Sequence, residues 1–217
     1  MRHLTTAYRG LAVDVVLFLK AQLIGLSIAA PVGPIGLLCI QRTLDHGARI
    51  GFLSGLGAAT ADGVYGAIGA FGLAAVTRFF VTLAAPLALC GAAFLVWMGC
   101  RMLRTVPTSE LASVPDIGGN WSAFASVFAL TLTNPATIVS FIAVFATLGG
   151  DAATTTSAAL VMVCGVLSGS ALWWLVLALG VAGVRHRIGP RLRLAINRCS
   201  GLFLLGFAAW QLATVFR

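Results

Sequence analysis

Asp62 is the only charged residue in the apolar stretch 50–77, which makes it the first candidate for chemistry. It stands about 12 residues into a predicted membrane helix, a depth at which an ionisable group costs a few kcal/mol. Helical spacing places Asp62 on a face of small residues that packs against other helices, formed with Gly55, Ala58, Ala59, Gly66 and Gly69. We therefore expect Asp62 to face the interior and to bind a substrate ammonium, exchange a proton, or both. The structural alternative is a neutral aspartic acid hydrogen-bonded to a neighbouring helix.

Two proline motifs indicate a complementary site for a carboxylate. Gly33 and Pro34 follow Pro31, and this run removes backbone donors in mid-membrane, so a helix break is expected near Gly33. In Asn134-Pro135, asparagine is a preferred N-cap and proline is favoured at the first helical position. Two such breaks would leave backbone N–H groups and positive helix ends inside the bilayer, where they suit an anion. A simple proline kink is the alternative for each break.

Other polar and aromatic side chains are weaker candidates. Tyr65 and Trp173 each stand one turn beyond a polar residue and could wall a substrate cavity, although packing is their commoner role. A polar group near Asn134 could line the same cavity or bond to its own helix; it comprises Thr131, Thr133, Thr137 and Ser140. The five cysteines form no C-x-x-C pair and the three histidines fall in termini or connections, so we expect neither a metal site nor a cofactor.

The composition requires these residues to be positioned by membrane helices. Only 9% of the 217 residues are charged and 59% are hydrophobic. The mean hydropathy is +1.00, and a soluble domain could not cover its surface with so few charges. The sequence predicts an all-α, polytopic membrane protein with six hydrophobic helices, at about 12–43, 48–73, 79–103, 121–148, 156–184 and 194–216.

The distribution of lysine and arginine predicts the orientation. Nine of these residues, including Arg42 and the cluster 185–198, fall in connections 1–2, 3–4 and 5–6, against five on the other side. The positive-inside rule then places the first group in the cytoplasm. The basic N-terminus disagrees with this orientation, so five spans and six spans both stay open.

The two halves of the chain echo each other in order. Pro34 matches Pro135, the run from Gly57 to Tyr65 with Asp62 matches the run from Gly165 to Trp173 with Ser170, and Gly91 corresponds to Gly201. Three spans in each half imply repeats of opposite orientation, as in many secondary transporters. The predicted organisation is a first three-helix repeat (1–104), a loop linker (105–120) and a second repeat (121–217), all in one integral membrane domain. Chance similarity between glycine-rich helices is the alternative.

Three motifs together resemble the LysE/RhtB family of amino-acid exporters. They are Ala30-Pro31-Val32-Gly33-Pro34, the run from Gly47 to Asp62, and Leu132-Thr133-Asn134-Pro135, and the resemblance covers nearly the whole chain. It implies proton-driven export from the bacterial cytoplasm of an amino acid such as homoserine, threonine, lysine or arginine. It also implies that Gly33–Pro34, Asp62 and Asn134–Pro135 are the functional positions. No second intramembrane acid is present, which favours a neutral over a strongly cationic substrate.

The resulting hypothesis is an alternating-access exporter, not an enzyme. Gly33, Pro34, Asn134 and Pro135 would hold the substrate carboxylate, with Tyr65 beside them, while Asp62 binds the ammonium and exchanges it for a proton. One alternative is a membrane thiol-redox electron carrier, which requires cysteines at equivalent places in both halves. The other is a divalent-cation exporter, which requires several intramembrane carboxylates or histidines as ligands.

The expected location is the bacterial inner membrane, with the chain crossing it several times. The expected partners are the amino-acid substrate, protons and the lipid bilayer, without nucleic acid. The oligomeric state stays open, with a homodimer among the options.

Overall fold

The computed structural model describes residues 2–31, 33–71, 82, 84–104, 119–134, 137–138, 140–141 and 155–215. Every element in this part of the chain is helical, which confirms the all-α class. The elements are α1 (Arg2–Ala29), α2 (Pro34–His46), α3 (Ala48–Ala70), α5 (Ala84–Arg104), α6 (Gly119–Leu132), α8 (Thr156–Val184), the short 3-10 helix η2 (Arg185–Arg187) and α9 (Pro190–Val215). They overlap the predicted segments, with two differences: the first segment is two helices, α1 and α2, and α6 ends at Leu132, before the predicted end of the fourth segment. Most of the predicted linker lies outside the described residues.

The break predicted near Gly33 is present. Helix α1 ends at Ala29 and α2 begins at Pro34, with an 82° bend between the two helices. Gly33 is the N-cap of α2 and has an extended backbone (φ −111°), and no side chain caps the helix. Proline supplies no backbone N–H, and its ring clashes with the backbone carbonyl one turn earlier in a helix. A straight helix through this sequence is therefore unfavourable.

A second interruption follows α6. The helix ends at Leu132, and the N–H groups of Thr137 and Ile138 donate to the Asn134 carbonyl at 3.1 and 3.2 Å. A new helical turn therefore starts after Asn134, as its N-cap character predicts. Pro135 lies outside the described residues.

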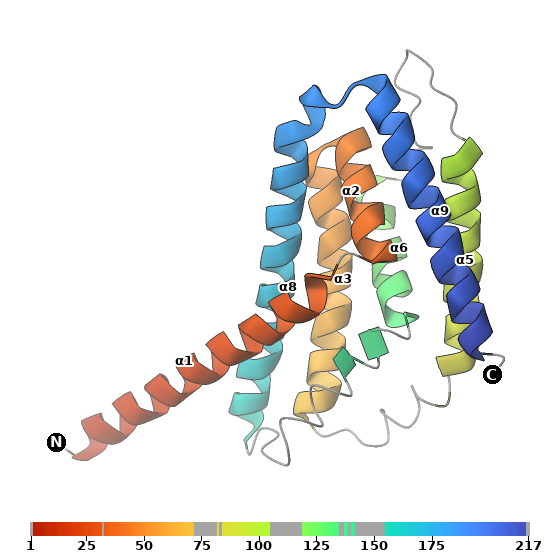
Figure 1. Cartoon of the computed structure of the whole chain (residues 1–217). Helices are drawn as coiled ribbons and strands as arrows, with labels where there is room; N and C mark the ends of the chain where they lie inside the picture. Colours follow the sequence, from red (N-terminus) through yellow and green to blue (C-terminus); the bar gives the residue numbers. More distant parts are fainter. Residues whose placement is uncertain are drawn as a thin grey trace.

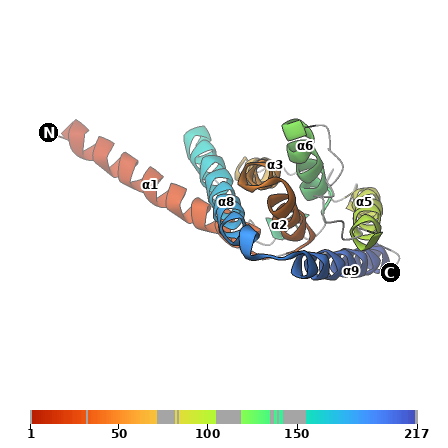
Figure 2. The same cartoon turned by 90° about the horizontal axis from the view of Figure 1, so that it is seen from above.

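The helices form a bundle from which α1 extends at an angle (Figure 1). Helix α8 packs between α1 and α3, and α3 packs in turn against α6. Helices α5 and α9 form a separate pair on the other side, and the short α2 lies between α3 and α9, as the view from above shows (Figure 2).

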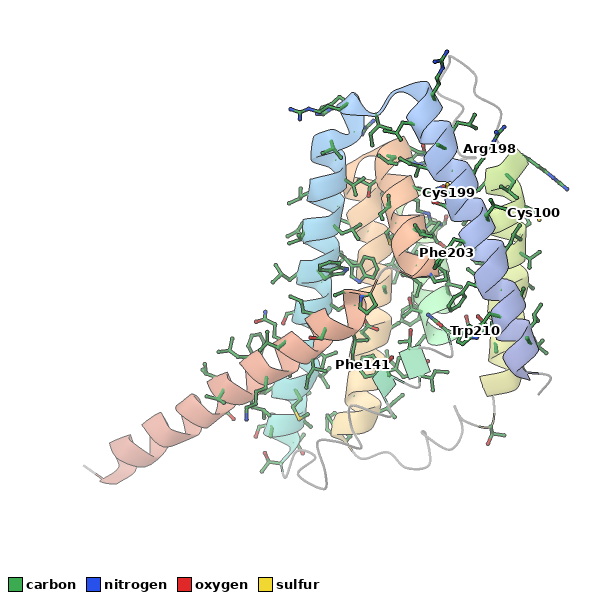
Figure 3. The ribbon with its side chains drawn as sticks, in the orientation of Figure 1. Cys100, Phe141, Arg198, Cys199, Phe203 and Trp210 are labelled. Carbon is green, nitrogen blue, oxygen red and sulfur yellow. The ribbon has the colours of Figure 1, made fainter. Side chains whose placement is uncertain are left out.

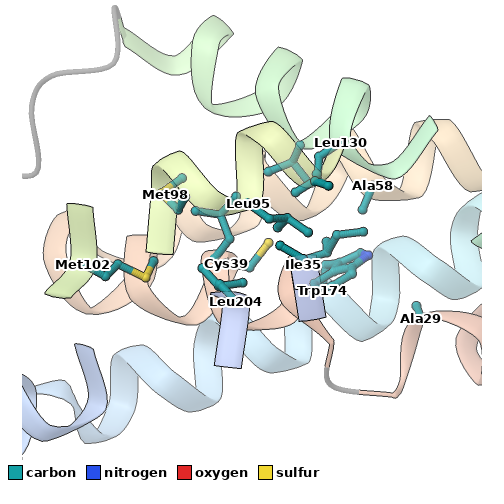
Figure 4. Close-up of a cluster of buried hydrophobic side chains, with 14 of the residues drawn as sticks. Ala29, Ile35, Cys39, Ala58, Leu95, Met98, Met102, Leu130, Trp174 and Leu204 are labelled. Carbon is teal, nitrogen blue, oxygen red and sulfur yellow. The ribbon is translucent and has the colours of Figure 1, made fainter. Parts of the chain in front are cut away.

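The largest cluster of buried apolar side chains draws on every described long helix. Ile35 and Cys39 of α2 meet Trp174 of α8, Leu130 of α6 and Leu204 of α9 (Figure 4). The short helix α2 thus lies at the centre of the molecule, because its side chains contribute to the core shared by both halves of the chain. A break at Gly33 positions α2 for this role.

Large apolar side chains also cover the outer surface. Phe203 and Trp210 of α9 are 47% and 55% exposed (Figure 3), and leucines and valines are exposed along α8. Such extensive exposed apolar surface suits contact with lipid. Among the described residues, the helix Thr156–Arg187 is long and apolar enough to cross a membrane alone, and α1 from Asp14 and α2 meet the same test as one bent pair.

Helices α1 and α8 approach closely at glycines. An ideal Cβ built on Gly169 would overlap the backbone carbonyl of Gln22, so α1 could not keep its position beside an alanine. We expect Gly169→Ala to lower the free energy of unfolding by about 1–3 kcal/mol, measured as a lower melting temperature in detergent. Gly180→Ala on the same helix is the control, because its Cβ would meet nothing within 4 Å. Equal melting temperatures for the two variants would contradict this packing.

Candidate functional site

Asp62 is buried between α3 and α8, in agreement with its small-residue face. It is 3% exposed, and its Oδ2 atom accepts a hydrogen bond from the Ser170 hydroxyl at 2.7 Å. The indole Nε1 of Trp174 donates in turn to the Ser170 oxygen at 3.2 Å. The Ser170 hydroxyl thus donates to the carboxylate and accepts from the indole, which fixes the orientation of Asp62. It also gives the buried carboxylate a hydrogen-bond partner.

Tyr65 contacts the interruption after α6. Its hydroxyl donates to the carbonyl of Leu132 at 2.7 Å, and its ring stacks on Phe141 at 5.5 Å between centroids. Leu132 is the last residue of α6, and its carbonyl is one of those that a helix end leaves without an intrahelical donor. Tyr65 therefore links α3 to the second break.

A small pocket lies where the two breaks approach each other. One side is formed by Pro34 and Ile35 at the start of α2, and another by Thr133 and Asn134 after α6. The remaining lining comes from α5, α6 and α9 and consists of Gly91, Leu95, Leu130, Phe207 and Gln211. The first-turn N–H groups of α2 have no acceptor within their own helix, and its positive end lies at this pocket. The arrangement can attract an anion.

The predicted site residues thus form two groups. Pro34 and Asn134 line the pocket, Gly33 caps α2 beside it, and Asp62 and Tyr65 lie outside the lining. The groups are joined through the core, because Ile35 of the pocket belongs to the same cluster as Trp174, whose indole bonds to Ser170 and so reaches Asp62 (Figure 4).

Arg42 requires a correction to the sequence interpretation, which counted it among the loop charges. It belongs to α2 and is 3% exposed. Its Nη1 donates to Ser54 Oγ at 3.0 Å and to the Ala123 carbonyl at 2.8 Å, and its Nη2 donates to Ser126 Oγ at 2.9 Å. Three neutral oxygens stabilise the guanidinium inside the protein. Without Arg42, eight of the nine counted charges remain, so the predicted orientation keeps its sign.

Two further residues of this region, Trp174 and Gln211, were not predicted from the sequence. Trp174 and not Trp173 bonds to Ser170, and Gln211 of α9 lines the pocket while its Nε2 donates to the Ala88 carbonyl at 2.6 Å. A signal existed for Gln211, since an amide in the apolar run 199–216 must find a partner. Choosing between adjacent tryptophans requires the rotation of α8, which the sequence does not define.

The described residues also bear on the alternative functions. Within them, no three metal-binding side chains of His, Cys, Asp or Glu gather at one place. All five cysteines are free, with Cys39 buried and Cys90, Cys164 and Cys199 exposed. Neither observation supports a metal or thiol-redox site.

Several known proteins are similar to this chain. The uncharacterized membrane protein YahN of Escherichia coli K12 is 32% identical over 174 residues, which cover 76% of this chain and 77% of YahN. The putative amino acid efflux protein YcgF of Bacillus subtilis 168 is 30% identical, covering 88% of this chain and 92% of YcgF. The arginine exporter protein ArgO of Salmonella paratyphi A is 30% identical, covering 88% of each chain. No solved structure matches significantly.

The family model for the LysE type translocators matches residues 26–214, which include both helix breaks, Asp62 and the pocket. Together with the exposed apolar surface, this match identifies a helical membrane protein of a transport family. The chain belongs to the family of LysE type translocators.

Proposed function

We propose that this protein exports an amino acid from the cytoplasm across the bacterial inner membrane in exchange for protons. The observation that carries the proposal is the pocket lined by both Pro34 and Asn134, where two interrupted helices meet. The names of two relatives, an arginine exporter and a putative amino acid efflux protein, support the substrate class. Interrupted helices are the usual substrate sites of secondary transporters.

In this proposal the substrate carboxylate binds at the helix breaks. The N-terminus of α2, capped by Gly33 without a side-chain bond, provides donors for the carboxylate. Asn134 and Pro135 provide the second contact. Asp62 exchanges the proton, while Ser170 and Trp174 hold it in the interior. In the same proposal, Asp62 also binds the substrate ammonium, with Tyr65 nearby. This contact requires a movement of α2 or α6 that opens the pocket toward α3.

We also propose that the chain contains two inverted repeats, residues 1–104 and 121–217, joined by 105–120, and that it crosses the membrane several times. The packing supports this arrangement, because corresponding helices make corresponding contacts. Helix α1 packs against α8 as α6 packs against α3, and α5 packs against its counterpart α9. Matched residues also meet: Asp62 bonds to Ser170. Gly201 approaches Gly99, with an ideal Cβ on each lying 2.9–3.0 Å from the carbonyl oxygen of the other, whereas its match in the sequence register is Gly91. The proposal therefore rests on the Asp62–Ser170 contact and on the helix pairs.

Export from loaded vesicles tests the carboxylate site. We expect Asn134→Ala to raise the KM for export by about tenfold, the effect of losing about 1.4 kcal/mol of binding. Asn120→Ala, at the exposed start of α6, is the matched control and should leave the KM unchanged. A growth-toxicity screen with amino acids and their analogues, with and without expression, identifies the substrate to load. Normal export by Asn134→Ala would remove the carboxylate role of this break.

A further inference from the structure

We propose that the end of the bundle where α8 joins α9 binds an anionic phospholipid, with arginine side chains on its phosphate and apolar side chains on its acyl chains. This surface lies outside the pocket lining at the helix breaks, and the proposal holds whichever substrate the protein exports. The exposed arginines that define this basic end are Arg49, Arg104, Arg187, Arg191 and Arg198.

The basic end is assembled from elements that are far apart in the sequence. The 3-10 helix η2 joins α8 to α9, and the Nη1 atom of its Arg185 lies 2.9 Å from an ideal Cβ on Gly47, the residue between α2 and α3. Helices α5 and α9 run in opposite directions and approach at Gly99 and Gly201, so α5 ends beside the first turns of α9 (Figure 1). The arginines of α3, α5, η2 and α9 therefore gather at one end of the molecule.

Positive charge exceeds negative charge at the basic end. Besides the five exposed arginines, Arg101 and Arg185 are half-buried there. The described acid at this end is Asp45 of α2, which is half-buried, and the sequence between α5 and α6 adds Glu110 and Asp116. Seven arginines with described side chains thus stand against three acids, so an anion is the complementary ligand.

Exposed apolar side chains adjoin these arginines and suit a ligand that also has an apolar part. On α9, Leu202 is 61% exposed and follows Arg198 by one turn, and Figure 3 shows Phe203 beside it. On α5, Trp97 is 52% exposed and precedes Arg101 by one turn, with the guanidinium 5.2 Å from the ring centroid. Residues one turn apart share a helix face, and tryptophan is enriched where lipid chains meet headgroups. Each helix therefore presents an apolar side chain and then a guanidinium, in the order of acyl chain and phosphate.

The type of cation suits a phosphate. All the cations of the basic end are arginines, and the one lysine of the sequence, Lys20, belongs to α1. A guanidinium can donate two parallel N–H bonds to phosphate oxygens, whereas an ammonium acts as a point charge. The rule that sets membrane orientation counts lysine and arginine alike. Exchange of arginine for lysine consequently separates phosphate binding from membrane orientation.

The experiment measures the lipids that stay bound to the purified full-length protein, by mass spectrometry. The protein is first equilibrated with micelles that contain equal amounts of phosphatidylglycerol and phosphatidylcholine. The wild type should retain the anionic lipid at least about fivefold over the zwitterionic one, the effect of one arginine on an anionic lipid. Replacing Arg104, Arg191 and Arg198 together by glutamine should abolish this preference, and replacing them by lysine should remove more than half of it. Lys20→Gln, an exposed cation outside the basic end, is the control and should keep the preference.

Equal retention of the two lipids by the wild type, or an undiminished preference in the glutamine variant, would overturn the inference. A lysine variant equal to the wild type would overturn it too, because charge alone would then suffice. Excess inorganic phosphate should displace little of the anionic lipid, and complete displacement would mean that the surface takes a free anion. Melting curves in phosphatidylcholine micelles verify that each variant is folded, and Arg191→Gln alone, with a smaller expected loss, replaces a triple variant that does not fold. Export does not enter the measurement, so a failure of the export function leaves this test unchanged.

Discussion

Replacing Asp62 by asparagine is expected to abolish the response of export to a pH gradient. The asparagine side chain has the same size, and its amide oxygen can still accept from Ser170, so the packing between α3 and α8 is retained. It cannot take up or release a proton at physiological pH, because an amide does not titrate there. We expect gradient-driven export to fall by at least about tenfold, equivalent to about 1.4 kcal/mol of lost coupling.

The measurement compares two modes of transport in vesicles. Gradient-driven export requires proton exchange, whereas exchange of labelled for unlabelled substrate at equal pH does not. Asp62→Asn should lose the first mode and retain more of the second. Asp14→Asn, which changes an exposed acid on α1, is the matched control and should retain both. Undiminished gradient-driven export by Asp62→Asn would remove Asp62 from the coupling mechanism.

Substituting Arg42 by methionine is expected to destabilise the bundle. The guanidinium connects α2 to Ser54 of α3 and to Ala123 and Ser126 of α6, so it holds parts of both halves together. Hydrogen bonds to a charged group contribute about 1.5–3 kcal/mol each, and removing the buried charge offsets part of their loss. The net loss is expected to be about 1–3 kcal/mol, or several degrees in melting temperature at about 2–4 °C per kcal/mol for a chain of this size.

Melting curves of purified protein in detergent test this role. Arg42→Lys should be intermediate, because an ammonium cannot reproduce the spread of donors of a guanidinium. Arg104→Met, at the exposed end of α5, is the control and should melt as the wild type does. A melting temperature of Arg42→Met equal to that of the control would mean that the burial cost cancels the three bonds.

Arg42 also connects the two helices that reach the pocket. It lies in the helix that starts at the pocket, and its partners Ala123 and Ser126 belong to α6, which ends at the second break. One side chain thus ties together the two helices whose ends form the pocket. Its Nε atom and the Nε2 atom of Gln41 are buried and have no hydrogen-bond partner among the described residues.

Local features of the sequence determined the helices and their breaks. Apolar runs between charges defined the segments, and the prolines at 31 and 34 defined the bend between α1 and α2, because both effects act within a few residues. The interior position of Asp62 followed from the same logic, since its face on α3 is composed of glycine and alanine. The roles of Gly33, Pro34, Asp62, Tyr65, Asn134 and Pro135 in transport stay predictions.

Only the tertiary structure decided which polar groups meet. Arg42 bonds to Ala123, 81 residues away, Asp62 to Ser170 at a separation of 108, and Gln211 to Ala88 at 123. Such partners depend on the rotation and crossing of whole helices, and the sequence pattern defines neither, because many faces of an apolar helix are equally acceptable in lipid. The tertiary structure therefore shows that Asp62 lies outside the lining of the pocket at the breaks. It also shows that Arg42, which the sequence assigned to a loop, is buried in the core.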